Sequence, residues 1–247
     1  MATSGTTSFS VTRNDIISAS LRLLGVLEEG ATPNPTAIEN ASLVLNMLIK
    51  DWMTDGIKLW TTTEIVLPLV ANQTSYSIGP ESTNDLVTNK PLRLIQAFLR
   101  NMSVDPYIDL PMTLISEQEY NILGSKFSEG AINSVYYKPY VNHGIAKVFL
   151  TPNTSTAEDY VLHMNVQRPI EDITSANQTF DFPSEWYQSL RWGLAAELAS
   201  EYGLTTERIS AIISRSNSYK DRLAAWDTEY NSTFFQPDVR MNQHAYR

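Results

Sequence analysis

The chain has 247 residues, of which 43% are hydrophobic and 10% aromatic, so it is long enough to bury a substantial core. Only 18% of the residues are charged and the formal net charge is −9 at pH 7, which argues against a protein that grips DNA through a basic surface. The absence of cysteine excludes disulfides and thiolate metal sites, and no run approaches the roughly 18 apolar residues of a membrane helix.

The first predicted elements are two helices. Thr12 is a suitable N-cap, because Asp15 follows three residues later and apolar residues then recur at helical spacing. Pro35 stands where a first helical residue is favoured, so a second helix is predicted over residues 36–55, with Gly56 ending it. Its apolar positions recur every three or four residues, which predicts one buried face. They are Ile38, Ala41, Leu45, Leu48 and Trp52.

The middle of the chain, residues 59–182, is predicted to be mostly strands. Short segments such as EIVLPLV, SYSIG and VYYKPY are rich in β-branched and aromatic residues, and turn signals separate them. This pattern is typical of an antiparallel sandwich or barrel. A short helix is expected within it, with Ser116 as N-cap and Glu119 completing a capping box.

The last third returns to helical periodicity. In the segment PSEWYQSLRWGLAAELASEYG, Ser184 is predicted to cap a helix that Gly203 ends. The apolar stripe expected on that helix consists of Tyr187, Leu190, Leu194, Leu198 and Tyr202. A further helix is predicted from about Thr206. Its near-heptad stripe consists of Ile209, Ile212, Ser216, Tyr219, Leu223, Trp226 and Tyr230.

These elements predict an α+β fold, namely a helical bundle built from both ends of the chain, with an inserted antiparallel β module and an extended C-terminal tail. The expected boundaries are a flexible N-terminus over residues 1–11, a helical bundle core over 12–58 and 183–231, a β-rich module over 59–182 and a tail over 232–247. The residues expected in the core are Leu45, Leu48, Trp52, Tyr187, Leu190, Leu194 and Leu198.

The sequence contains no recognisable catalytic constellation. The histidines His143, His163 and His244 are far apart, and glycine-rich phosphate loops and the nucleophile motif of hydrolases are absent. Neighbouring carboxylates such as Glu117 and Glu119 are better explained by helix capping than by catalysis, which needs carboxylates facing each other across a cleft. We therefore expect no catalytic residue, no metal site and no cofactor, and a protein that is not an enzyme.

Five segments, in order along the chain, resemble the motifs of one family. The segment AIENASLVLNMLIKDWMTDG carries a helix pattern at Ala41, Leu45, Asn46, Leu48, Trp52 and Gly56. The segment LVANQTSYSIG carries a strand–turn–strand pattern at Gln73, Tyr76, Ile78 and Gly79. The other three segments are KPLRLIQAFLRN, FLTPNTSTAEDYVLHM and FPSEWYQSLRWGLAAELASEYG.

Together these segments, from about Asp15 to Gly203, resemble the head-to-tail adaptors of short-tailed bacteriophages, also described as packaged-DNA stabilisation or tubular tail proteins. Departures from the pattern are Phe182 for the usual leucine, Trp186 for the usual tyrosine, and the pair Trp192 and Gly193 for a more polar pair. We interpret these departures as changes of packing.

The resemblance implies a structural virion protein. Such a protein forms a dodecameric ring between the portal protein and the tail nozzle or tubular tail protein, extends the DNA channel, and helps to retain the genome until ejection. Double-stranded DNA would pass through the lumen without sequence-specific binding, and no membrane is implied. The expected location is the head–tail junction of the virion, after synthesis in the host bacterial cytoplasm.

In a ring of this kind, each subunit presents two different faces to its neighbours. The candidates for the subunit boundary are Trp186, Arg191, Trp192 and Glu197. Trp186 and Trp192 stand six residues apart, and for both the choice between core and subunit boundary stays open. The resemblance also implies that the tail docks on the portal, for which the candidates are Phe234, Phe235, Asp238, Arg240, Tyr246 and Arg247.

An alternative function is a carbohydrate- or receptor-binding β module of a phage tail or surface protein. It is motivated by aromatic residues in the β-rich part of the chain, which stack on sugar rings when they line an exposed groove. These residues are Trp60, Tyr136, Tyr137 and Tyr140.

Overall fold

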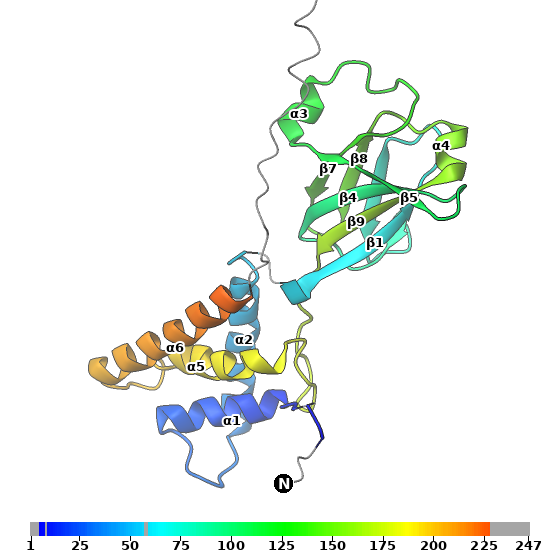
Figure 1. Ribbon diagram of the computed structural model, residues 1–247. Coiled ribbons are helices and arrows are strands. Elements are labelled where there is room, and N and C mark those ends of the chain that lie inside the picture. Colours follow the sequence, from blue (N-terminus) through cyan, green and yellow to red (C-terminus); the bar gives the residue numbers. More distant parts are fainter. Residues whose placement is uncertain (1–4, 8, 57–58, 228–247) are drawn as a thin grey trace, which may run out of the picture.

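The chain forms two units, each with its own hydrophobic core (Figure 1). The computed structural model describes residues 5–7, 9–56 and 59–227. The chain leaves the helical unit before Thr62 and returns to it after Gln167. The elements of the helical unit are α1 (Arg13–Leu24), α2 (Pro35–Trp52), η1 (Leu59–Thr61), η2 (Ser184–Trp186), α5 (Tyr187–Leu198) and α6 (Thr206–Trp226).

The β unit consists of two sheets and two short helices, α3 (Glu117–Ile122) and α4 (Thr154–Asp159). One sheet has the strand order β1-β9-β4-β5 and the other β3-β2-β8-β7-β6. The strands are β1 (Thr62–Pro68), β2 (Ser75–Gly79), β3 (Leu86–Val87), β4 (Arg93–Asn101), β5 (Ile108–Pro111), β6 (Thr113–Leu114), β7 (Ser134–Pro139), β8 (Gly144–Phe149) and β9 (Tyr160–Gln167).

The two sheets share one core because alternate side chains of their strands point inward. In β8 the burial alternates residue by residue, with Ala146 and Val148 fully buried. From the other sheet, Leu162 and Met164 of β9 join the same cluster and are likewise inaccessible to solvent. The strands therefore carry an apolar core of their own, separate from the one formed by the helices.

The fold class expected from the sequence is wrong. The described residues form a mixed α/β structure of roughly 37% helix and 24% strand, with six helices and two sheets of four and five strands, instead of a predominantly helical bundle. The β unit is also not purely antiparallel, since β3 pairs parallel to β2 and β6 pairs parallel to β7. Strands β3 and β6 are only two residues long. Two residues are too few to show an alternation of polar and apolar side chains, so the sequence does not predict these strands.

Local hydrogen bonds place the helix starts where the sequence indicates them. Thr12 Oγ1 accepts from the Asp15 amide at 3.3 Å, while the Asp15 carboxylate accepts from the Thr12 amide at 2.9 Å, so the capping box is confirmed. The same reciprocal pair forms between Ser116 and Glu119 at the start of α3. Helix α2 begins at Pro35, with the Asn34 side chain as its cap.

The ends of two helices differ from the sequence-based prediction. Helix α2 ends at Trp52, before the expected Gly56. Ser184 makes no capping hydrogen bond, because residues 184–186 form the 3-10 helix η2 and α5 begins only at Tyr187. Helix α5 ends at Leu198, several residues before Gly203.

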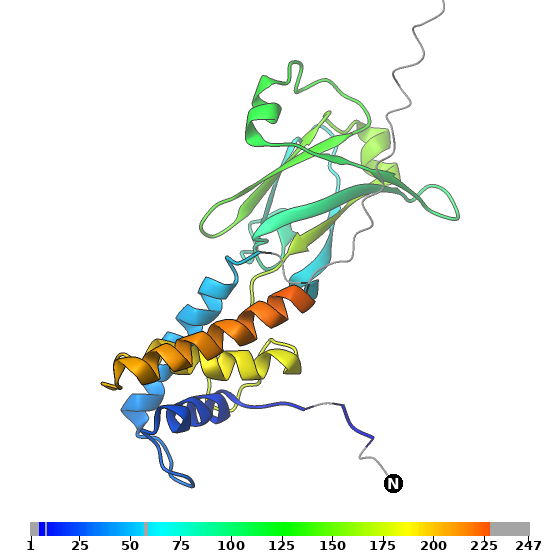
Figure 2. The ribbon, with the colours of Figure 1, turned by 60° about the vertical axis from the view of Figure 1, so that its left-hand side comes forward.

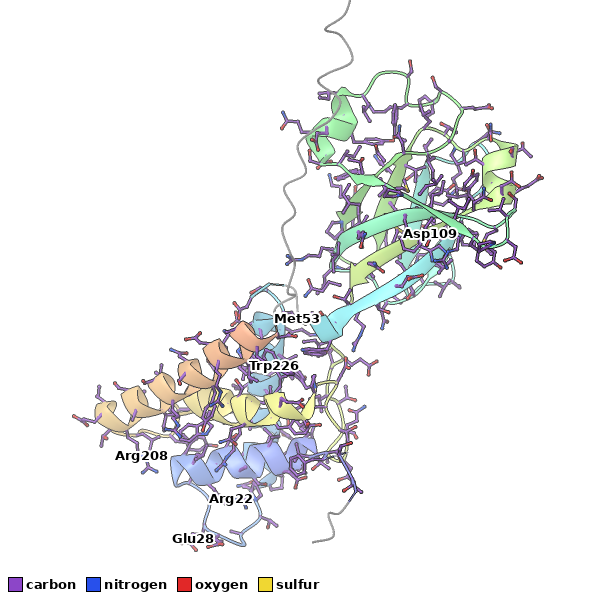
Figure 3. The ribbon with its side chains drawn as sticks, in the orientation of Figure 1. Arg22, Glu28, Met53, Asp109, Arg208 and Trp226 are labelled. Atoms are coloured by element: carbon purple, nitrogen blue, oxygen red, sulfur yellow. The ribbon has the colours of Figure 1, made fainter. Side chains whose placement is uncertain are left out.

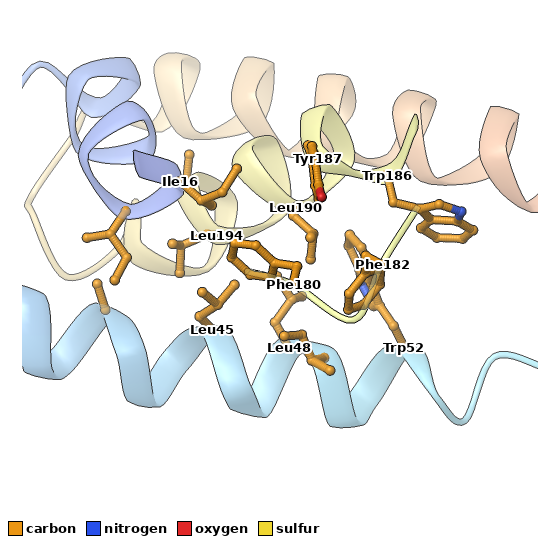
Figure 4. Close-up of a cluster of buried hydrophobic side chains, with 14 of the residues drawn as sticks. Ile16, Leu45, Leu48, Trp52, Phe180, Phe182, Trp186, Tyr187, Leu190 and Leu194 are labelled. Atoms are coloured by element: carbon orange, nitrogen blue, oxygen red, sulfur yellow. The ribbon is translucent and has the colours of Figure 1, made fainter. Parts of the chain in front are cut away.

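The helical unit packs around an aromatic and aliphatic core (Figure 4). Helix α2 lies along one side of α5, and the stripes of both helices meet between them. All seven residues expected in the core have at most 8% of their surface exposed. Gly193 permits close approach, because a Cβ added there would lie 2.9 Å from Cζ2 of Trp52 and 3.0 Å from Cδ2 of Leu48.

The connection from β9 back to η2 belongs to the helical core, although the sequence placed residues up to 182 in the β module. Ile170, Ile173, Phe180 and Phe182 are buried against the helices. The Asn46 side chain holds this segment from α2, since its amide donates to the Ile173 carbonyl and its oxygen accepts from the Ile173 amide, both at 3.2 Å.

An ion pair fixes the same segment at its two ends. Asp181 accepts hydrogen bonds from the Arg168 guanidinium and, at 3.3 Å, from the Glu171 amide. Burial alone would raise the pKa of Asp181, but these hydrogen bonds and the positive charge of Arg168 outweigh burial and leave that pKa lowered. Because the folded-state pKa is lowered, the stabilisation is complete above the unfolded carboxyl pKa of about 3.9 and is lost as the pH falls through the folded value.

We expect Asp181→Asn to lower the free energy of unfolding by about 1–2 kcal/mol at pH 7, because a charge-assisted pair is weakened. The difference from the unsubstituted protein should be smaller at pH 3, because the stabilisation from a carboxylate of lowered pKa is progressively lost below the unfolded pKa of about 3.9. Urea unfolding at both pH values measures this. Glu81→Gln is the matched control, since Glu81 is exposed and makes no ion pair in the described residues. An Asp181→Asn effect of equal size at pH 7 and pH 3 would contradict the expectation.

Candidate functional site

The part of the chain that the structure describes contains no cluster of metal-binding side chains. Within residues 5–7, 9–56 and 59–227, no group of three or more His, Asp or Glu side chains is positioned to hold a metal ion. In the same part of the chain, no helix combines the length and the apolar character that crossing a bilayer requires.

His163, the more enclosed of the two histidines that the structure describes, is held by packing between strands. Its ring stacks on Phe98 of β4 with centroids 4.9 Å apart, and Nδ1 lies 2.5 Å from the Glu64 carboxylate of β1. These partners come from the two strands that flank β9 in the sheet. No serine, threonine or second carboxylate is hydrogen-bonded to this pair in the described residues, so cross-strand packing accounts for the arrangement.

The aromatic residues considered for sugar binding do not line one groove. The Trp60 ring packs in the helical core, 4.9 Å from Phe182. Tyr136 is buried, and Tyr137 donates its hydroxyl to the Pro91 carbonyl at 2.7 Å, in an environment whose burial raises the pKa of Tyr137. Of these four, only Tyr140 is exposed, with 45% of its surface accessible; it lies at the turn between β7 and β8 and stacks on His143.

Trp186 lies inside the helical core. Only 2% of its surface is exposed, and its ring centroid lies 6.0 Å from Trp52, 6.2 Å from Phe182 and 6.3 Å from Trp60. An indole enclosed in this way contacts its own chain and is inaccessible to a neighbouring subunit. The choice left open by the sequence is therefore resolved for Trp186 in favour of the core.

Trp192 lies at the edge of the core, beneath arginine side chains of α6. Its ring centroid lies 6.1 Å from that of Tyr219. The guanidinium carbon of Arg215 lies 5.9 Å from the Trp192 ring centroid and 5.4 Å from the Tyr219 ring centroid. The guanidinium carbon of Arg222 lies over the Tyr219 ring, 4.9 Å from its centroid. A hydrogen bond from Arg215, a second from Gln188, and the charges of both arginines lower the pKa of Tyr219. Two arginines therefore lie over one pair of aromatic rings in a protein of net charge −9.

The positive character extends along one side of α6. Arg208, Arg215 and Arg222 follow one another at intervals of seven residues, which keeps them on one face of the helix. Arg208 reaches across to the end of α1, where its Nη2 donates to the Leu23 carbonyl at 3.2 Å. Arg22 of α1 lies at the same end of the helical unit as Arg208 (Figure 3).

We call the set Arg22, Arg191, Arg208, Arg215 and Arg222 the arginine surface. No carboxylate of the described residues forms an ion pair with any of its members. The Nε of Arg191 and the indole N–H of the adjacent Trp192 are buried, and neither has a hydrogen-bond partner in that part of the chain. The net negative charge of the chain does not indicate a positive surface, so the sequence did not lead us to predict one. The spacing of Arg208, Arg215 and Arg222 at intervals of seven residues could have indicated it.

A groove runs between α1, α5 and α6 within the arginine surface. Its volume is about 510 Å³. The floor is apolar, formed by Leu23, Ala211, Ile212 and the Trp192 ring, and two arginines flank it. The residues that line it are Leu23, Trp192, Arg208, Ala211, Ile212 and Arg215. Such a groove accommodates an apolar side chain accompanied by negative charge.

Glu197 lies elsewhere on the unit. It is exposed and lines a second, smaller groove of about 310 Å³ together with residues of α2 and α6, among them Asp51 and Lys220. The four candidates for a subunit boundary are thus distributed over the core, the arginine surface and this second groove. The portal-docking candidates Phe234, Phe235, Asp238, Arg240, Tyr246 and Arg247 fall outside the described residues.

Comparisons with known proteins add no assignment. A scan against models of protein families and a search of curated proteins each found no match for this chain.

Proposed function

We propose that the protein is a head-to-tail adaptor of a short-tailed bacteriophage. In this role, copies form a ring between the portal and the tail nozzle, continue the DNA channel, and help to retain the packaged genome. The protein acts by assembly and carries out no chemical reaction. Its partners are the portal, the nozzle or tubular tail protein, neighbouring copies, and the double-stranded DNA that passes through the lumen.

The observation that carries the proposal is the meeting of the two helical segments on which the family resemblance rests. They are separated by more than a hundred residues, yet α2 and the η2–α5 segment pack directly against each other. The pattern residues Leu45, Leu48 and Trp52 belong to the same core as Leu190, Leu194 and Leu198. The motif residues of both segments are therefore mutually dependent parts of one packed unit, which supports reading them as one family pattern.

Three of the four departures from the family pattern, Phe182, Trp186 and Gly193, lie around one aromatic cluster, whereas Trp192 packs on Tyr219 at the edge of the core. Phe182 and Trp186 stand in place of smaller residues, and both rings pack with Trp60. Gly193 makes room for the Trp52 ring, which also packs on Trp186. Because larger rings and a glycine beside the Trp52 ring occur together, we interpret these three departures as a repacked core.

The test is association with the portal encoded by the same phage genome. We expect the full-length protein to co-sediment with portal rings in a fixed ratio, and to leave the supernatant only when portal is present. A portal from a phage with an unrelated tail serves as the control and should leave the protein in the supernatant. Failure to co-sediment with the cognate portal over a range of protein concentrations would contradict the proposal.

A further inference from the structure

Helix α2 carries an exposed ridge whose composition is complementary to the groove in the arginine surface. Glu39, Leu43, Met47 and Asp51 follow one another at intervals of four residues, so they form one continuous row along the helix. All four are exposed, and Leu43 and Met47 expose 57% and 59% of their surface. The row places two large apolar side chains between two carboxylates, and we call it the acidic ridge.

The apolar part of the acidic ridge points away from its own core. At 100° per residue, Leu43 and Met47 lie on the opposite side of α2 from the buried stripe. Asp51 lies nearer the buried Leu48, at the edge of the groove that Glu197 and Lys220 also line. The groove of the arginine surface is lined by α1, α5 and α6 and takes no residue from α2. The two surfaces therefore share no element, and a single copy cannot bring them together without unfolding.

The two surfaces match in chemistry and in length. The ridge offers exposed carboxylates around Leu43 and Met47, while the groove offers arginines that have no carboxylate partner among the described residues, around an apolar floor. Along the helix axis, Glu39 and Asp51 are about 18 Å apart, and Arg208 and Arg222 are about 21 Å apart, at 1.5 Å per residue. Pairing would give the arginines carboxylate partners and remove exposed apolar surface from water.

We propose that the occupant of the arginine groove is the acidic ridge of a second copy of this chain. The contact is heterologous, since one copy contributes α2 and the other contributes α1, α5 and α6. Repeated contacts of this kind close into a ring or continue as a filament, according to the rotation between copies. The inference rests on the proposed function in one respect, because it assigns the neighbouring copies of the adaptor ring to specific faces.

The floor of the groove favours a protein occupant over duplex DNA. A phosphate backbone offers no apolar group to cover Leu23, Ala211 and Ile212, whereas Leu43 or Met47 of another copy does. The aromatic rings nearby are already engaged, since Trp192 and Tyr219 pack on each other and under Arg215. They are therefore not free to stack on bases, as strand-binding surfaces require.

Site-directed disulfide formation tests the pairing, because the natural chain has no cysteine to interfere. One batch of full-length protein carries Met47→Cys and a second carries Ala211→Cys. We expect mild oxidation of the mixture to give the mixed dimer in at least about tenfold excess over either same-site dimer, since tenfold corresponds to about 1.4 kcal/mol of preference. Val141→Cys, at a position that is 90% exposed on the β unit, is the control partner for each batch.

Charge reversal distinguishes specific pairing from random collision, because disulfides formed by random collision would not depend on these charges. Adding Asp51→Arg to the Met47→Cys protein, or Arg215→Asp to the Ala211→Cys protein, should reduce the mixed dimer to the level of the Val141→Cys control. Combining the two reversed proteins should restore it. Circular dichroism and thermal melting of each variant establish that it is folded, and Arg222→Asp replaces Arg215→Asp if the latter perturbs the packing on Tyr219.

Three results would overturn the proposal: equal yields for mixed and same-site dimers, mixed dimers no more abundant than the Val141→Cys control, or charge reversals without effect. Tight binding of duplex DNA that Arg215→Asp abolishes, together with non-selective disulfides, would assign the surface to nucleic acid instead. Because the experiment contains no portal, its outcome is independent of portal association. A selective disulfide without portal binding would leave the self-pairing intact and contradict the adaptor function alone.

Discussion

Replacing Trp186 by alanine is expected to lower the free energy of unfolding by about 3–5 kcal/mol, the range for removing a large aromatic side chain from a well-packed core. The indole is 98% enclosed and touches the rings of Trp52, Trp60 and Phe182. These partners come from α2, from the segment that leads into β1, and from the connection that returns from β9. A single truncation therefore opens a cavity at the point where the helical unit meets both connections.

Urea unfolding of the purified variant measures this effect, with tryptophan fluorescence and far-ultraviolet circular dichroism as probes. Trp226→Ala is the matched control, because Trp226 exposes 66% of its surface at the end of α6 (Figure 3), and its loss should change stability by no more than about 0.5 kcal/mol. Equal effects of the two substitutions would show that Trp186 is not part of the core in solution. If Trp186→Ala yields no soluble protein, Trp186→Phe should fold with an intermediate loss of stability.

Deleting residues 232–247 is expected to abolish association with the portal while leaving the fold intact. Helical periodicity stops after Asn231, and the tail then carries Phe234, Phe235 and Tyr246 without any pattern that would bury them. Among residues 5–7, 9–56 and 59–227, the last member of the helical core cluster is Leu223, so the deletion leaves that described core complete. We expect portal affinity to fall on the order of a hundredfold or more, equal to about 3 kcal/mol, because aromatic anchors must offset the ordering of the tail.

Co-sedimentation with portal and urea unfolding, carried out on the same preparation, separate docking from stability. A double substitution, Phe234→Ala with Phe235→Ala, tests the anchors without shortening the chain. The matched control is Phe127→Ala, which removes an aromatic ring that is 83% exposed on the β unit. Unchanged portal affinity after deletion of residues 232–247 would contradict the docking role of the tail, whatever the effect of the deletion on stability.

The parts of the fold that depend on neighbours in sequence were predictable. The starts of α1 and α3 are determined by hydrogen bonds between residues three apart, Thr12 with Asp15 and Ser116 with Glu119, and a sequence displays such pairs directly. The buried stripe of α2 follows from the helical repeat in the same way, since Leu45 and Leu48 must share a face. Propensity and periodicity are local properties, and they were sufficient for these elements.

The fold class was not predictable, because it depends on contacts between residues far apart in sequence. In the β unit, β9 pairs with β1 and β4, about a hundred and about sixty residues before it, and β3 and β6 join their sheet through parallel pairs. Figure 2 shows that the strands form a unit as prominent as the helices. Counting helices at both chain ends therefore overstated the share of the helical bundle.

The candidate surfaces were also only partly predictable, because helical spacing follows from the local sequence whereas burial depends on contacts with distant segments. Tryptophans six residues apart lie on different faces of a helix. Trp186, however, belongs to the 3-10 helix η2 and is enclosed by the rings of Trp52, Trp60 and Phe182, which helical periodicity alone does not predict. The exposed Trp226 ends a stripe that the heptad pattern extended too far. The first turn of α5 is level with Tyr219, since Gln188 hydrogen-bonds to it, so α5 does not reach the part of α6 that carries Trp226. The acidic ridge and the arginine surface became recognisable only when burial distinguished the exposed positions of α2 and α6 from the buried ones.

Electron microscopy of the cognate portal mixed with the full-length protein tests the central claim most directly. The proposed function predicts an additional ring of protein on one end of the portal, coaxial with the channel and with one copy per portal subunit. In that ring, α2 of each copy should face the α1, α5 and α6 groove of its neighbour. Portal rings that remain bare, or protein that decorates the portal away from its axis, would contradict the assignment of this chain as a head-to-tail adaptor.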